Sequence, residues 1–345
     1  MRDRKGQRPG NQRPNGARGG RPAPPTQRRP MKRFTDSRTR ALELLEIAVQ
    51  YMQDGQHVKA LEAAGESVYL DPSEARGYIL IGDIHLHEGD ISEAKEAYVK
   101  GLAKAKQGKR DPDIDEQGTF LALEAQSGIS RCALMLADYD GALDSLLAQL
   151  RLDTADPLGA GQLLAELYLF KGDYEKARKV FLDQPPLLPD GFLVAGFAHY
   201  ECGDLASAVS SLRLALLSNL YLVAALLGEE PPDFGIIHGI EEAGPIFATD
   251  VAIRIEPYLS VREEVVEFVA DLATCPTVMK EVQAVMDYAR ALNTTADATE
   301  RGRMIHELAR LRDPSRIDAT TPSVLTELGG LTPPSSAPPA SEIPC

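Results

Sequence analysis

The sequence predicts an all-α protein, built as a solenoid of helical hairpins with a C-terminal helical capping bundle and two disordered tails. Three observations lead to this fold class. Between residues 38 and 312, apolar residues recur with the period of amphipathic helices, and no convincing run alternates as strands do. One short phrase recurs at intervals close to 34 residues. Residues 1–37 have almost no aliphatic side chains, and residues 313–345 are rich in Pro, Ser and Thr, so neither end is expected to join the core.

The first segment, residues 1–37, consists mainly of Arg, Gly, Pro, Gln and Asn and is predicted to be disordered. Residues 1–40 carry a net charge of +11 in a chain whose net charge is −14, so a basic tail precedes an acidic body. Residues 16–21 resemble the RGG-type segments that bind RNA through phosphate contacts and arginine stacking. The tail residues expected to contact RNA are Arg13, Arg18, Arg21, Arg28 and Arg29. The alternatives are a tail that only solubilises the protein and a tail that pairs with an anionic surface or with the acidic body of the same chain.

The body, residues 38–228, contains five copies of the recurring phrase, in which a Gly is followed by Asp or a variant and, five positions after the Gly, by Ala. The copies begin at Gly55, Gly89, Ala137, Gly172 and Gly203 and contain Ala60, Ala94, Ala142, Ala177 and Ala208. The one long interval, 48 residues, is explained by a loop-like insertion near residues 106–113. Gly suits the left-handed backbone that ends a helix, Asp can cap the next helix, and Ala lets the two helices pack closely. Each copy therefore predicts a helical hairpin.

These copies resemble the tetratricopeptide repeat family, whose 34-residue unit has small residues at its eighth and twentieth positions. The resemblance implies a right-handed solenoid with units starting at Ala41, Ala75, Leu123, Leu158 and Pro189. Residues 219–228 are also similar to a phrase found in relatives of the suppressor-of-tumorigenicity-seven family.

The C-terminal part begins with a turn-rich joint at residues 231–235 and is predicted to form a helical bundle over residues 229–312. Three or four helices are expected, at about 244–256, 258–273, 276–292 and 297–311, and they would cap the apolar end of the solenoid. Residues 313–345 are rich in Pro, Ser and Thr and are predicted to be a flexible tail, apart from a short helical turn near 324–328.

Sequence motifs for catalysis, cofactors and metals are missing, since the chain has no phosphate loop, no zinc-protease pair and no nucleophile elbow. His85 and His87 point to different sides of a helix, so packed or solvated histidines are expected there and not a metal site. The four cysteines are far apart, which favours reduced thiols in a cytoplasmic protein. The most apolar stretch, residues 205–228, is too polar to span a membrane. We therefore expect a protein that is not an enzyme, has no cofactor and has no membrane span.

The resemblance further implies that the first helices of the hairpins line a concave groove with positions two, five, nine, twelve and thirteen of each unit. Leu45 and Val49 stand at two positions where chaperone-binding members carry a clamp for a C-terminal carboxylate, which argues against that function. The residues expected to bind a partner are Met52, Asp83, Leu86, Arg131, Met135, Glu166, Phe170, Phe197 and Tyr200. This mixture suits a peptide or amphipathic helix with some positive charge. The predicted function is a protein–protein interaction scaffold, and the alternative is an RNA-associated adaptor that uses the basic tail.

Overall fold

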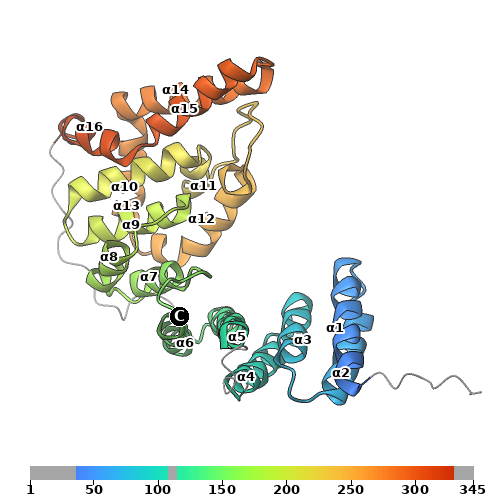
Figure 1. Cartoon of the computed structure of the whole chain (residues 1–345). Coiled ribbons are helices and arrows are strands. Elements are labelled where there is room, and N and C mark those ends of the chain that lie inside the picture. Colours follow the sequence, from blue (N-terminus) through green and yellow to red (C-terminus); the bar gives the residue numbers. More distant parts are fainter. Residues whose placement is uncertain (1–35, 108–114, 330–345) are drawn as a thin grey trace, which may run out of the picture. The chain divides into compact units, whose positions relative to one another are not determined.

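A computed structural model describes residues 36–107 and 115–329, and in these ranges the regular structure is helical, with no strand (Figure 1). The first ten helices form five consecutive antiparallel hairpins. Their bounds are α1 Ser37–Gln53, α2 His57–Leu70, α3 Ala75–Glu88, α4 Ile91–Gln107, α5 Asp115–Met135, α6 Tyr139–Leu152, α7 Ala160–Phe170, α8 Tyr174–Asp183, α9 Pro189–Glu201 and α10 Leu205–Ser218. The predicted all-α repeat fold is confirmed.

Each hairpin turns on a residue with a left-handed backbone, as the recurring phrase predicts. The φ angles are 69° at Gly55, 85° at Gly89, 55° at Ala137, 72° at Gly172 and 77° at Gly203. The next residue caps the second helix in two hairpins: Asp138 accepts a hydrogen bond from the Gly141 N–H, and Asp204 from the Ser207 N–H. The third hairpin therefore keeps the turn although Ala replaces Gly, at the steric cost of a Cβ in this conformation.

The alanine of each phrase lies on the buried face of the second helix of its hairpin. All five, Ala60, Ala94, Ala142, Ala177 and Ala208, are fully buried. A larger side chain would find no space there without moving a helix, because protein interiors are close-packed. The register deduced from the sequence is thus the register of the fold.

After the fifth hairpin the chain continues as a short helix, a turn-rich joint and a helical bundle. The elements are α11 Leu222–Leu226, a single 3₁₀ turn η2 Glu241–Ala243, α12 Pro245–Leu259, α13 Glu263–Thr274, α14 Pro276–Thr294 and α15 Ala298–Leu311. The joint is held by Tyr221, whose ring lies 5.0 Å from the ring of Phe234 and whose hydroxyl is 2.9 Å from His238 Nε2. Three or four helices were expected here, and the structure has four, each close to one of the predicted ranges.

One further helix corrects the predicted boundary at residue 313. Residues Pro314–Glu327 form α16, which packs against α10 with Ile317 and Val324 fully buried. The expectation of a flexible segment is therefore wrong for these residues. Polar residues dominate α16, but its few apolar residues pack into the core and Thr321 hydrogen-bonds to the distant helix α10, contacts that composition does not reveal.

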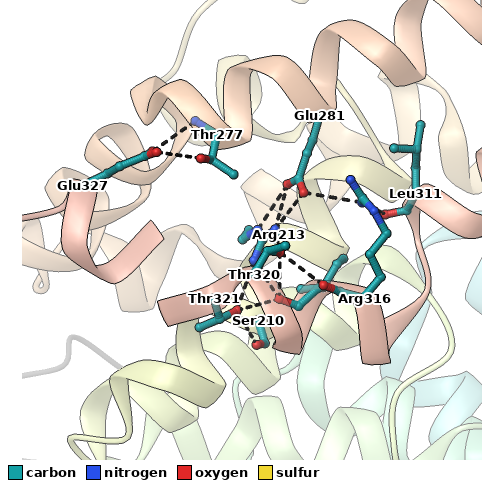
Figure 2. A network of polar contacts seen from close by, with 10 residues as sticks. Ser210, Arg213, Thr277, Glu281, Leu311, Arg316, Thr320, Thr321 and Glu327 are labelled. Carbon is teal, nitrogen blue, oxygen red and sulfur yellow. Dashed lines mark hydrogen bonds and ion pairs between the residues drawn. The ribbon is translucent and has the colours of Figure 1, made fainter. Parts of the chain in front are cut away.

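Arg213 of α10 is the centre of that polar network (Figure 2). Its guanidinium is fully buried and donates to Glu281 of α14 at 2.8 Å and, on α16, to Thr320 Oγ1 at 2.7 Å and the Ile317 carbonyl at 3.0 Å. A buried charge is tolerated only when it is paired and hydrogen-bonded in this way. Arg213 thus joins α14 and α16 to the last hairpin.

The remaining expectations on the tails and the insertion fall on residues 1–35, 108–114 and 330–345, outside the described residues. Among the residues that the structure describes, Cys132, Cys202 and Cys275 are free thiols. In the same ranges, no helix combines the length and the apolar character needed to cross a bilayer.

Candidate functional site

The first helices of the hairpins form two groove segments that differ in what covers them. The N-terminal groove is a depression of about 440 Å³ among α1, α3 and α5. Its walls are apolar and its polar residues are mostly acidic: the lining residues are Leu42, Leu45, Glu46, Val49, Arg76, Ile79, Leu80, Asp83 and Glu124. An open apolar surface with a carboxylate border suits a ligand that is apolar and carries positive charge.

Asp83 and Glu124 provide two of the three carboxylates that line the N-terminal groove, and Glu46 is the third. Asp83 Oδ1 accepts a hydrogen bond from the Tyr98 hydroxyl at 2.6 Å and lies 3.7 Å from the Arg131 guanidinium. Burial nevertheless raises the pKa of Asp83 above its ordinary value. Burial also raises the pKa of Glu124, and the negative charge of Asp83 adds to the effect. The two carboxylates therefore repel each other in a partly desolvated site, and a cation between them would relieve that repulsion.

The C-terminal groove, formed by α7 and α9, is filled by the chain's own helices α12 and α13. Arg254 of α12 donates from one nitrogen to Glu166 of α7 at 2.9 Å and to Asp190 of α9 at 2.7 Å. The side chains of Glu166 and Asp190 are only 4% and 6% exposed, whereas Arg254 is 37% exposed. Burial raises the pKa of Glu166, and the charge of Arg254 opposes that rise. Arg254 is thus an ionic anchor for α12.

Aromatic contacts continue this attachment along α9. The ring of Phe197 lies 5.6 Å from that of Tyr258 of α12, and the ring of Tyr200 stacks at 4.6 Å on Phe268 of α13. The Tyr258 hydroxyl also donates to Glu201 at 2.7 Å. Such aromatic pairs add to the energy of simple burial. The C-terminal bundle therefore does more than cap the end of the repeats, because two of its helices occupy the groove.

This arrangement corrects three of the predicted partner-binding residues. Glu166, Phe197 and Tyr200 are buried against α12 or α13, so the expectation that they face an external partner does not hold in this structure. Phe170 is half-buried and packs against the same C-terminal core. Their positions on the first helices were inferred correctly, but the groove they face is occupied.

The other predicted residues lie in the first three hairpins. Asp83 lines the N-terminal groove, and Arg131 is exposed beside it. Met52 and Leu86 are half-buried and pack against the cores of their own hairpins, whereas Met135 is 60% exposed. Sequence reasoning missed Glu124 and Asp190. Both stand at position two of their units, which is a groove position of the family. The predicted starts of the units were therefore sufficient to find them.

The histidines of α2 and α3 contact one another and nearby carboxylates. His57 Nδ1 contacts Glu88, and the rings of His57 and His87 meet edge-on at 4.5 Å. No group of three or more metal-ligating side chains stands in a metal-binding arrangement within residues 36–107 and 115–329. The arginines of the tail, for which RNA contacts were expected, lie outside those ranges.

Comparisons with known proteins support the resemblance to the tetratricopeptide repeat family. The family model for the tetratricopeptide repeat matches residues 75–103 and 162–183, which correspond to α3–α4 and α7–α8. No curated protein matches the sequence. None of these comparisons shows the resemblance of residues 219–228 to the suppressor-of-tumorigenicity-seven family.

Two solved structures are among those similar to part of this chain. One is the crystal structure of YrrB, described as a TPR protein with an unusual peptide-binding site, with 19% identity and a TM-score of 0.41 over 51% of this chain and 84% of that one. The other is Pseudomonas aeruginosa pilF, with 16% identity and a TM-score of 0.30 over 52% of this chain and 91% of that one.

Proposed function

We propose that this protein is a non-enzymatic interaction scaffold that binds a peptide or helix of a partner protein in the N-terminal groove. The observation that carries the proposal is the contrast between the two groove segments. The C-terminal groove is filled by α12 and α13 of the same chain. The N-terminal groove has a similar apolar and acidic lining and is open.

The exposed apolar residues of the N-terminal groove support this role. Val49, which is 43% exposed, lines the depression together with the partly buried Leu80 and the buried Ile79. A ligand that covered these side chains would bury apolar surface, which is the main source of affinity in helix-in-groove recognition. Repeats that stack only on their neighbours leave this face free for binding.

Site-specific photo-cross-linking tests the proposal. A benzoylphenylalanine in place of Val49 should cross-link to a defined partner when the full chain is expressed in the cells that produce it. The matched control replaces Val99, a 50% exposed valine on α4, a second helix of a hairpin. A partner captured from position 99 and not from position 49 would place binding on the second helices and refute the proposed site.

A further inference from the structure

The carboxylates of the two groove segments occupy equivalent positions in the repeats. Asp83 is the ninth residue of the second unit, and Glu124 is the second residue of the third. Glu166 is likewise the ninth residue of the fourth unit, and Asp190 is the second of the fifth. In each pair, therefore, one carboxylate stands on the first helix of a unit and the other at the equivalent position on the first helix of the next unit.

The other two junctions between successive units carry no such pair of carboxylates. The same positions are occupied by Val49 and Arg76 between units one and two, and by Arg131 and Gly159 between units three and four. The paired carboxylates thus occur at only two of the four junctions between units. At one of these two junctions the carboxylates already bind a side chain of the same protein.

That ligand is Arg254, and it shows what a carboxylate pair at these positions binds. One guanidinium nitrogen is shared between the two carboxylates, at 2.9 Å and 2.7 Å. The arginine belongs to an amphipathic helix whose buried residues Val251, Ile255 and Tyr258 lie on the same side as Arg254, at helical spacing. An arginine flanked by apolar residues on one helical face is therefore the ligand that this chain itself uses.

The N-terminal pair has capacity left for such a ligand. Both contacts of Asp83, from Tyr98 and Arg131, are made to Oδ1. Within the part of the chain that the structure describes, Glu124 has no ion-pair partner, and the ion pair of Asp83 with Arg131 is long, at 3.7 Å. Both residues line the same 440 Å³ depression. A guanidinium with its planar set of donors can bridge two carboxylates that an ammonium group would bind only as a point charge.

We propose that the ligand of the N-terminal groove is an amphipathic helix whose arginine is shared by Asp83 and Glu124, as Arg254 is shared by Glu166 and Asp190. This inference rests on the proposed function and names the chemistry of the partner. Apolar residues one turn before and after the arginine pack on Val49, Ile79 and Leu80. The acidic border excludes helices that carry a carboxylate at the arginine position, because like charges in a partly desolvated site repel.

The test is selection from a phage-displayed library of 15-residue peptides, the length of α12, on the full chain. A selected peptide is assigned to the N-terminal groove when it cross-links to benzoylphenylalanine in place of Val49 and not in place of Val99. Such peptides should be enriched in arginine. Replacing that arginine with the neutral isostere citrulline should weaken binding at least about tenfold.

The matching variant of the protein itself is Asp83→Asn/Glu124→Gln. It keeps the side-chain shapes and an oxygen that can accept the hydrogen bond of the Tyr98 hydroxyl. In this variant the citrulline substitution should change affinity by less than about threefold, because the interaction has already been removed. The control is Glu93→Gln/Asp144→Asn, which removes two exposed carboxylates from α4 and α6 and should keep the tenfold effect. Thermal melting of each variant verifies its fold.

Three results would overturn the inference, and they distinguish its failure from that of the proposed function. Groove-assigned peptides without arginine enrichment, or a citrulline effect that persists in Asp83→Asn/Glu124→Gln, would show that the groove binds helices without using the carboxylate pair. In that case the proposed function stands. Selected peptides that never cross-link at position 49 would overturn both.

Discussion

Replacing Arg254 with methionine tests whether α12 is fixed in the C-terminal groove by its ion pairs. The substitution keeps a long apolar side chain and removes the guanidinium, so Glu166 and Asp190 remain as two unpaired buried carboxylates. Removing one partner of a buried ion pair costs about 3–5 kcal/mol. Because Arg254 is 37% exposed, water reaches the site, and we expect the free energy of unfolding to fall by about 2–3 kcal/mol.

The assay is urea unfolding of the full chain at pH 7, followed by far-ultraviolet circular dichroism. A second variant, Arg254→Met/Glu166→Gln/Asp190→Asn, removes all three charges and leaves neutral groups of similar shape. Its stability should return to within about 1 kcal/mol of the natural chain, because buried ionic clusters can be replaced by neutral groups at little cost. Equal stabilities of the single and triple variants would refute the reasoning, since the loss would then not come from unpaired buried charge.

Three further predictions follow from single side chains. Phe197→Ala should lower the free energy of unfolding by about 3–5 kcal/mol in thermal melts, because Phe197 is fully buried against Tyr258. Ala137→Gly should raise it by about 0.5–1 kcal/mol by relieving the left-handed alanine, whereas Gly172→Ala should lower it by about 1 kcal/mol. Glu124→Gln should be more stable than the natural chain at pH 7, and the difference should shrink as the pH falls towards 4.5.

The sign of the pH effect follows from the raised pKa of Glu124. Burial and the charge of Asp83 disfavour the ionised form in the folded chain, so the folded pKa lies above the ordinary value of 4.5. Below that value the carboxyl is protonated in both states and resembles glutamine. As the pH rises through the folded pKa, only the natural chain loses stability. Urea titrations at several pH values measure this, and a difference that grows on acidification would contradict the burial of Glu124.

The sequence predicted the hairpins well because their determinants are local. The glycine with positive φ lies in the turn and the alanine five residues later lies in the helix that follows. Gly89 and Ala94 therefore both predict the same hairpin. These signals repeat with the unit length and reinforce one another. The inner positions of the first helices follow from the same register.

The filling of the C-terminal groove could not be read from the repeats, because its occupant lies far along the chain. Phe197 meets Tyr258 and Glu166 meets Arg254, partners separated by 61 and 88 residues. Helix α16 was missed for the same reason. Its buried Thr321 accepts a hydrogen bond from Arg213, more than 100 residues earlier, so a Pro- and Thr-rich composition concealed a packed helix.

Amide hydrogen exchange of the full chain, with and without a saturating arginine peptide selected on it, tests the central claim most directly. The claim is that an external ligand occupies the N-terminal groove while α12 keeps the C-terminal one. Binding should slow exchange in α1, α3 and α5 and leave α7, α9 and α12 unchanged. Slower exchange in α7 and α9 together with faster exchange in α12 would contradict the claim, because it would show that the ligand displaces α12 from its own groove.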